Sequence, residues 1–408
     1  MSRSPSSAAA AGRTRPYTIG MLAPCPFPSH QGTQVFIRHL ASALSGAGHG
    51  VHLVTYGHGE YEELGLPVQM HRAAAVDVGL RSGPSLRRPL ADAALFVTAL
   101  EVARRHHPDV WHAHNIEGLA LGILLQRLTR VPLVYHAHNT MALELPTYYR
   151  HGSTRALVRR AGGLVDRSLP RLADATVVFD DGQRRLLEAN DVAAARLHVI
   201  LPGQPEREAG AAAPGMVARL RARLGVGAWL IYAGNPDRYQ NLPLLWQALP
   251  RVRAVRADVR VLVATSHRVT CFADEYREAG SPAGVVFERY RDVGELDALL
   301  ALARVGLCPR ALEGGAPIKV LSYVAAGVPV VACRPGAGHL VTPECGLVVE
   351  PTVEAFAAGV LRLLEAAPDA DAVQQAGRKR FSIERQVAQY EAVYAAVTRR
   401  ALGRAELS

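Results

Sequence analysis

The chain has 408 residues, which is too long for one ordinary hydrophobic core, so two domains of about 150–200 residues each are expected. Half of its residues are apolar and no uninterrupted apolar stretch reaches about 18 residues, which excludes a disordered chain and a membrane-spanning helix. The net charge of +10 suits an anionic partner. No zinc-finger, RNP or helix-turn-helix signature accompanies it, so we expect no nucleic-acid partner. The arginine-rich stretches 81–88 and 155–167 are interpreted as solvated helix faces.

Residues 1–16 lack the apolar centre of a signal peptide and are expected to form a disordered leader. The five cysteines are scattered without metal-ligand spacing, so we interpret them as reduced thiols. These features favour a cytoplasmic protein, and peripheral contact with a membrane surface is left open.

Strand and helix patterns alternate along the first half of the chain, which is typical of a parallel α/β sheet. A helix is expected from Thr33 to about Ala47. The expected strands are 17–22, 51–56, 109–114, 131–138, 174–179 and 197–201.

A loop-like segment at 203–215, rich in Gly, Ala and Pro, indicates a domain boundary, and a second alternating series follows it. The expected strands of this series are 229–234, 259–265, 284–290, 305–311, 329–333 and 346–350, and residues 374–402 are expected to be helical. We therefore predict an α/β protein with an N-terminal Rossmann-like domain at 17–203 and a C-terminal one at 204–380. A final helix at 381–408 follows, and its crossing back to the first domain is left open. Ligands of such folds bind beyond the carboxyl ends of the strands, so the cleft between the domains is the predicted site.

The stretch EGGAPIKVLSYVAAGVPVVAC, residues 313–333, contains Lys319, one of only two lysines in the chain. Its pattern predicts a Gly-rich loop, a short helix that begins near Pro317 and ends at Gly327, and then a strand. Lys319 falls in the first turn, where the helix dipole disfavours a cation unless an anion is bound there. The amides of residues 314–316 together with Lys319 are therefore candidates to hold a phosphate. A surface lysine beside a structural turn is the alternative.

This stretch resembles the nucleotide-sugar signature of the retaining GT-B glycosyltransferases of family 4, E-G-x-G-x-P-x-x-E-A-x-x-x-G-x-P-V-V. Other segments agree in the same order: PFPSHQGTQVFIRHLASALSGAGHGVHLVTYG, PDVWHAH, VPLVYHAHNT and YAGNPDRYQNLPLLWQAL. The likeness covers residues 17 to 400. It implies two Rossmann-like domains that face a central cleft, and transfer of a sugar from a nucleoside-diphosphate sugar with retention of configuration.

The sequence also departs from the family pattern. Ser322 stands where the family's second glutamate holds the ribose, and Asn235 and Gln240 stand where an arginine and a lysine clamp the diphosphate. These changes indicate a sub-branch in which Lys319 and Arg238 supply the phosphate charge. The donor-binding residues implied by the resemblance are Gly32, Asn235, Glu313, Gly314, Gly315, Ala316, Ile318, Ser322, Glu288 and Arg289.

By the same resemblance, His138 corresponds to the histidine that contacts the donor sugar, and we predict His138, Lys319 and Arg238 as the catalytic residues. The predicted acceptor-binding residues are Thr33, His114, Glu144 and Tyr148. His112, His114, His136 and His138 alternate on two expected strands, yet we predict no metal because the family generally needs none. Asp180 and Asp181 are interpreted as a helix cap.

We predict a retaining glycosyltransferase without a cofactor, whose partners are a nucleotide-sugar donor and a small-molecule or lipid-linked acceptor. Two alternatives within enzymes are a nucleotide-sugar 2-epimerase and a phosphorylase of the same fold. A third is a transferase-like binding protein without activity. The sequence does not determine the sugar, the nucleotide, the acceptor or the oligomeric state.

Overall fold

The computed structural model describes residues 15–60, 65–79, 83, 85–149, 151–205 and 213–405. Residues 1–14 of the expected leader therefore lie outside the described residues, as do residues 81, 82 and 84 of the first arginine-rich stretch.

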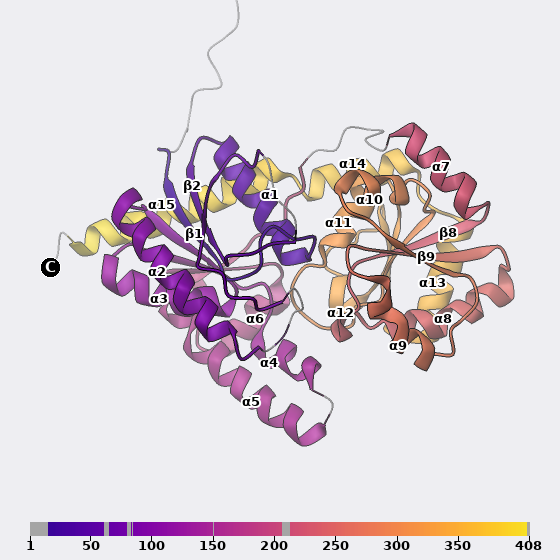
Figure 1. The fold of residues 1–408 in the computed structure, drawn as a ribbon, viewed down its shortest axis with the longest axis horizontal. Coiled ribbons are helices and arrows are strands. Elements are labelled where there is room, and N and C mark those ends of the chain that lie inside the picture. The colour runs from indigo at the N-terminus through magenta and orange to yellow at the C-terminus, as the bar shows by residue number, and fades with distance from the viewer. Residues whose placement is uncertain are drawn as a thin grey trace, which may run out of the picture.

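The N-terminal domain is built on a seven-stranded parallel sheet in the order β3-β2-β1-β4-β5-β6-β7 (Figure 1). Its strands are β1 (Thr18–Ala23), β2 (Gly50–Thr55), β3 (Gln69–Arg72), β4 (Val110–His114), β5 (Leu133–His136), β6 (Ala175–Val178) and β7 (Leu197–Val199). Most of their residues are buried because helices cover both faces of the sheet, as is usual for parallel sheets. The strand order reverses between β1 and β4, which makes this point the topological switch of the sheet.

Helices of this domain bury one apolar face each, as α1 does with Phe36, Ile37, Leu40 and Leu44. They are α1 (Gly32–Gly46), α2 (Arg88–His106), α3 (Asn115–Thr129), α4 (Met141–Glu144), α5 (Gly152–Ser168) and α6 (Asp181–Ala189). Figure 1 shows α5 projecting away from the body of the domain.

The C-terminal domain has a six-stranded parallel sheet in the order β10-β9-β8-β11-β12-β13, with its switch point between β8 and β11. The strands are β8 (Ala228–Ala233), β9 (Val259–Thr265), β10 (Val285–Arg289), β11 (Val305–Cys308), β12 (Val330–Cys333) and β13 (Gly346–Val349). The helices are α7 (Pro214–Leu224), α8 (Leu242–Val255), α9 (Ala273–Glu278), α10 (Val293–Leu300), α11 (Ile318–Ala325), α12 (Arg334–Ala337), α13 (Val353–Glu365) and α14 (Ala370–Arg380).

The last helix, α15 (Ile383–Ala405), returns to the N-terminal domain and lies along its sheet (Figure 1). Its residues Val387, Tyr390, Val393, Tyr394 and Val397 are buried in the same cluster as β1 and α1. Where the chain crosses between the domains, the two connecting segments pair, since the Gln204 amide donates to the Phe381 carbonyl at 2.8 Å.

The predicted fold class is confirmed: two parallel, doubly wound sheets lie side by side. The expected strand 259–265 has the observed bounds, whereas the expected strands 131–138 and 305–311 end early, at His136 and Cys308. Strand β3, four residues long at the edge of the sheet, was not predicted.

The prediction of a single helix over 374–402 was wrong, because this segment contains the end of α14 and most of α15. The chain leaves the helical conformation at Phe381, where φ is −113° and ψ is 35°. Ser382 then accepts a hydrogen bond from the Arg385 amide at 3.0 Å, which caps the start of α15. This break directs α14 to the C-terminal domain and α15 to the N-terminal one.

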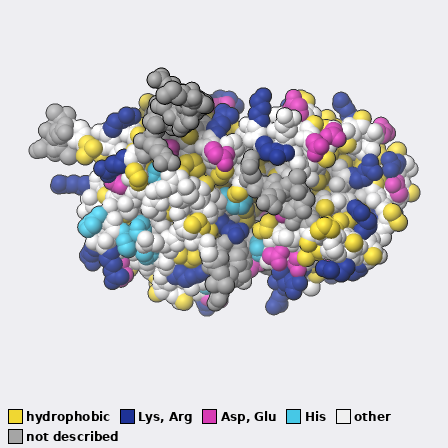
Figure 2. All heavy atoms as spheres, turned by 90° about the horizontal axis from the view of Figure 1, so that it is seen from above, with side chains coloured by type: hydrophobic (Ala, Val, Ile, Leu, Met, Phe, Trp, Pro, Cys, Tyr) yellow, Lys and Arg dark blue, Asp and Glu magenta, His cyan; other side chains and the backbone are white. Residues whose placement is uncertain are grey.

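None of the five cysteines forms a disulfide in the described part of the chain, and four of them are buried. Figure 2 shows Lys and Arg side chains scattered over both ends of one face among acidic ones, without a single basic stripe. Among the helices in the described ranges, none combines the length and the hydropathy needed to cross a bilayer.

The anchorage of α15 depends on buried tyrosine–histidine pairs, so we expect the Tyr390→Phe variant to be less stable. The substitution removes the hydroxyl that lies 2.8 Å from His136 Nδ1 and leaves a buried imidazole nitrogen without a partner. The expected loss is about 1–2 kcal/mol, measured as a lower midpoint of urea unfolding. Tyr149→Phe, outside this interface, is the control and should stay within about 0.5 kcal/mol. Equal midpoints for the Tyr390→Phe variant and the parent would contradict the role of this pair.

Candidate functional site

A pocket of about 180 Å³ lies between the two domains, at the carboxyl ends of both sheets. The loops after β1 and β5 approach it from the N-terminal domain, and the loops after β8 and β11 approach it from the C-terminal domain. These loops flank the switch points of the two sheets, which is where doubly wound folds bind their ligands. Its described lining contains Arg38, Arg310 and Lys319 and no carboxylate.

Two helices begin at this pocket, one from each domain, since the first residue of each lines it. Helix α1 begins at Gly32, and α11 begins at Ile318. Neither has an acidic residue in its first turn, so the partial positive charge of both helix ends is uncompensated by the protein. The arrangement favours an anionic ligand between the domains.

Lys319 is the second residue of α11, and its side chain lines the pocket. Its ammonium donates to Gln240 Oε1 at 2.8 Å and lies 3.9 Å from the centre of the Tyr232 ring. Burial lowers the pKa of Lys319 to about 7, with a smaller contribution from the nearby Arg310. A lysine whose contacts are an amide oxygen and an aromatic ring retains its capacity to attract an anion.

Arg310 lines the pocket and links the two domains, although it was not among the predicted site residues. Its guanidinium donates to the Gly314 carbonyl at 2.7 Å and, across the domain boundary, to Asn139 Oδ1 at 3.1 Å. The same group lies 5.2 Å from the centre of the Tyr239 ring. The sequence signal that could have found it is its place near the carboxyl end of the predicted strand 305–311, because strand ends line the cleft in this fold.

The loop at residues 313–316, here called the glycine loop, fits closely against the N-terminal domain. Gly314 and Gly315 both adopt positive φ angles, 78° and 70°. A Cβ atom on Gly315 would stand 2.7 Å from the carbonyl oxygen of His138, closer than real Cβ contacts come. Only glycine therefore allows this approach of the two domains.

His138 lies just beyond β5 and faces the pocket, although the strand expected to carry it ends two residues earlier. Its ring stacks on that of His136, with centroids 4.6 Å apart, and its Nε2 atom lies 3.0 Å from His114 Nδ1. Burial lowers the pKa of His138 to about 3, so the ring is neutral at pH 7.

The tautomer of His138 follows from the buried neighbour. His114 Nε2 has no partner among the described residues. A buried N–H without an acceptor is rarer than an acceptor without a donor, so His114 carries its proton on Nδ1 and donates to His138. His138 then carries its own proton on Nδ1 and can donate a hydrogen bond to a ligand in the pocket.

The structure brings many of the predicted site residues together and leaves others apart. The predicted residues that line the pocket are Gly32, Thr33, Asn235, Ala316, Ile318, Ser322, Lys319 and His138. Gly314 and Gly315 lie behind this lining, where they contact Gln183, Asn139 and Arg310.

Four of the residues predicted for donor binding or catalysis have side chains that do not reach the pocket lining. Arg238 and Glu313 are exposed. Glu288 forms a bidentate ion pair with Arg223, at 2.7 and 2.9 Å. Glu288 and Arg289 both line a separate pocket. Each of these residues belongs to a loop or a strand edge whose side-chain direction the sequence pattern does not determine.

The predicted acceptor residues are placed at different depths. Thr33 lines the pocket, whereas His114 is fully buried behind His138. Glu144 accepts a hydrogen bond from the Tyr148 hydroxyl at 2.7 Å, outside the lining. Burial raises the pKa of Glu144.

Further pocket residues were not predicted. They come from helix α1 and from the loops after β1, β9 and β10, which a single sequence does not mark as functional: His30, Arg38, His39, Ser266, His267 and Tyr290. His30 contacts the opposite domain, since its Nε2 atom lies 2.9 Å from the Arg291 carbonyl.

The other strand histidines form a buried group beneath the site. His112 and His136 are hydrogen-bonded to the hydroxyls of Tyr394 and Tyr390, each at 2.8 Å. The ligand atoms of His112, His114 and His136 lie within 4.8 Å of one another. Burial lowers the pKa of all three rings, and a divalent ion among them would be costly to desolvate.

Asp180 caps α6 by accepting a hydrogen bond from the Gln183 amide at 2.8 Å, as predicted.

Sequence comparisons assign both halves of the chain. The family described as Glycosyltransferase Family 4 matches residues 30–205, and the family described as Glycosyl transferases group 1 matches residues 227–366. The chain is 28% identical over 333 residues to the D-inositol 3-phosphate glycosyltransferase of Arthrobacter sp. (strain FB24), which covers 75% of this chain and 74% of that protein.

Solved structures show the same fold at low identity. Sucrose-phosphate synthase from Thermosynechococcus elongatus superposes with a TM-score of 0.76 at 18% identity, covering 93% of this chain and 98% of that one. Anabaena HepE, in complex with UDP and glucose, has a TM-score of 0.72 at 17% identity, covering 93% of this chain and 100% of that one.

The two Rossmann-like domains that face this pocket have the GT-B fold. This chain belongs to the family 4 and group 1 glycosyltransferases, as its resemblance implied.

The close fit of the glycine loop yields a prediction. Gly315→Ala should destabilise the closed arrangement of the domains, because the new methyl group meets the His138 carbonyl and the positive φ is strained for alanine. We expect a lower melting temperature or a larger radius of gyration by small-angle X-ray scattering.

Gly163→Ala is the matched control, since a Cβ at this position in α5 meets no atom within 4 Å. Its melting temperature should be unchanged or higher. A Gly315→Ala variant with the parent's stability and shape would show that the loop is not a fitted contact.

Proposed function

We propose that this glycosyltransferase moves a sugar from a nucleoside-diphosphate sugar to an acceptor hydroxyl or amine, with retention of configuration at the anomeric carbon. The observation that carries the proposal is the carboxylate-free pocket in which two helix amino ends, Lys319 and a neutral His138 meet. A second Anabaena HepE structure, in complex with UDP-glucose, and the D-inositol 3-phosphate glycosyltransferase support this class of substrates.

The leaving diphosphate would rest at the start of α11. Breaking the bond between the anomeric carbon and the phosphate oxygen places negative charge on the diphosphate, and fixed cations stabilise that charge most when water is excluded. Lys319 provides the mobile cation, and the amides at the start of α11 provide fixed partial charges. In this arrangement Arg310 holds the glycine loop in place and Ser322 offers a hydroxyl to the ribose.

The sugar would lie toward the N-terminal domain, within reach of His138. The Nδ1–H group of this neutral imidazole donates to a sugar hydroxyl and so orients the anomeric carbon toward the acceptor. Because the described lining offers no carboxylate nucleophile, we propose a front-face route. The acceptor oxygen or nitrogen bonds to the anomeric carbon as the phosphate bond breaks, and its proton passes to the departing phosphate oxygen.

The transferred group comes wholly from the donor, so the proposal includes no cofactor. We propose a cytoplasmic location and a small-molecule or lipid-linked acceptor.

The proposed phosphate contact predicts a pH dependence. The pKa of Lys319 is about 7 in the free protein, and a bound diphosphate would raise it. Below pH 7 the lysine is already charged, whereas above pH 7 binding must take up a proton, so affinity should fall, by up to about tenfold per pH unit. Isothermal titration with UDP-glucose and GDP-mannose between pH 7 and 9, in buffers of different ionisation enthalpy, measures both effects.

Lys319→Ala should weaken this binding strongly and remove its pH dependence. Lys379→Ala changes the only other lysine of the chain, which is exposed on α14, and should bind as the parent does. Undiminished binding by Lys319→Ala would refute the phosphate contact.

The reaction itself is tested by screening nucleotide sugars for a thermal shift and then following the best donor by NMR. We expect slow release of free sugar without an acceptor, and a transferred product with the anomeric configuration of the donor. His138→Ala should keep the thermal shift and lower turnover at least about 100-fold. Product of inverted configuration would exclude retention, and donor binding without release or transfer would exclude the transferase.

A further inference from the structure

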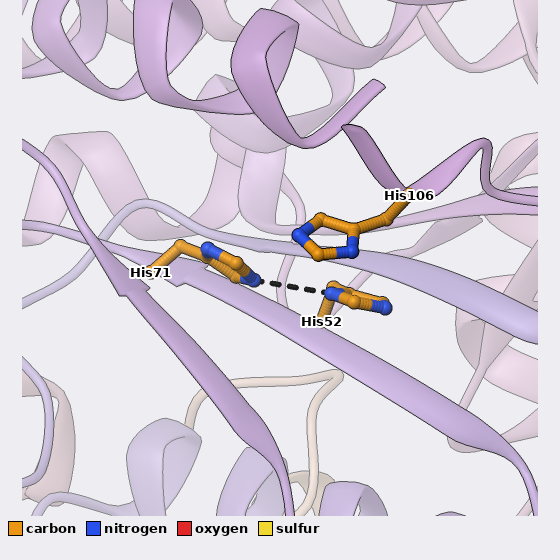
Figure 3. A group of neighbouring side chains, drawn as sticks. All are labelled: His52, His71 and His106. Carbon is orange, nitrogen blue, oxygen red and sulfur yellow. Dashed lines mark hydrogen bonds between the residues drawn. The ribbon is translucent and has the colours of Figure 1, made fainter. Parts of the chain in front are cut away.

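Three histidines meet on the N-terminal domain, outside the pocket lining (Figure 3). His52 lies on β2, His71 on the neighbouring edge strand β3, and His106 is the last residue of α2. In the register of the two strands His71 lies opposite Val54, two residues from His52, so both histidines share one face of the sheet. Val54 packs in one cluster with the buried side of α2, which places His106 over the same face.

The geometry of the three rings fits a shared ion. His52 Nδ1 and His71 Nε2 are 3.1 Å apart, and two nitrogens bound to one tetrahedral zinc are separated by about 3.3 Å. The ring centroid of His71 lies 5.3 Å from those of both His52 and His106, close to the value of about 5 Å for rings that point at one tetrahedral ion. The centroids of His52 and His106 are 4.0 Å apart, so these two rings must separate by about 1 Å to bind the same ion. One ligand atom from each of the three rings lies within 4.8 Å of the others.

We propose that His52, His71 and His106 bind one divalent transition-metal ion, Zn²⁺ or a similar ion of borderline softness, at a site separate from the cleft between the domains. Three imidazoles favour zinc, nickel or copper over the hard ions magnesium and calcium. The proton now shared by His52 and His71 moves to the far nitrogen of the ring that holds it, so that two neutral rings bind the metal.

The surroundings allow such an ion to enter. His71 and His106 are half-buried, so water can reach the group and fill the remaining coordination position. The carboxyl end of α2 supplies partial negative charge, which opposes the repulsion from the neighbouring Arg105. The bound metal would fasten the short edge strand β3 to β2 and to α2, at a place where only β2 pairs with β3.

The test uses protein without a histidine tag, dialysed against EDTA and then freed of chelator, and titrated with ZnCl₂ at pH 7.5. We expect one ion per chain and a melting temperature that rises with zinc. His71→Gln and His106→Gln should each weaken binding at least about tenfold. His107→Gln, which changes the adjacent exposed histidine, should bind as the parent does.

A crystal soaked in ZnCl₂ locates the ion directly. An anomalous peak at the zinc edge among His52, His71 and His106 supports the proposal. A peak among His112, His114 and His136 instead, a stoichiometry near zero, or unchanged affinity in both glutamine variants overturns it. Circular dichroism of each variant confirms that a loss of binding does not come from unfolding.

Discussion

The contact between the glycine loop and the loop after β5 determines how the two domains face each other. Gly315 lies against the main chain of His138 with no room for a side chain, and Arg310 links Gly314 to Asn139 across the boundary. This contact carries α11, and with it Lys319, to the side of the pocket opposite His138. A shift of about 1 Å here would separate the groups that the proposed reaction requires on one substrate, and such errors in position reduce rates strongly.

The C-terminal helix also helps to fix the position of His138, through buried contacts beneath the pocket. Because α15 returns to the N-terminal domain, Tyr390 and Tyr394 reach the Nδ1 atoms of His136 and His112. His136 in turn stacks on His138, and His114 donates to it. The ring at the pocket is therefore oriented by a buried polar network that includes the far end of the chain, and burial keeps its members neutral.

The features that could be predicted from the sequence are those that depend on neighbouring residues in the chain. The glycines and prolines around residues 313–333 punctuate the chain, so the short helix and the position of Lys319 in its first turn could be predicted. Arg310 escaped notice because its role arises from two acceptors, one of them in the other domain. Arg238 does not reach the pocket for a related reason: it opens a 3₁₀ turn, η4 (Arg238–Gln240), of which Tyr239 and Gln240 line the pocket and Arg238 does not. The break between α14 and α15 depends on pairing with the linker, which no periodicity reveals.

Ser322 stands where the family resemblance places a glutamate, and this difference bears on the electrostatics of the pocket. A carboxylate at this position, one turn beyond Lys319 on the same face of α11, would raise the pKa of the lysine and neutralise part of its field. The serine leaves Lys319 with an amide oxygen and an aromatic ring as its contacts. In the proposed function the free pocket is thus an anion site without its counter-charge, and the lysine reaches its full charge when an anion enters. Lysine can lose its proton while the pocket is empty, whereas an arginine such as Arg310 in the same pocket stays charged.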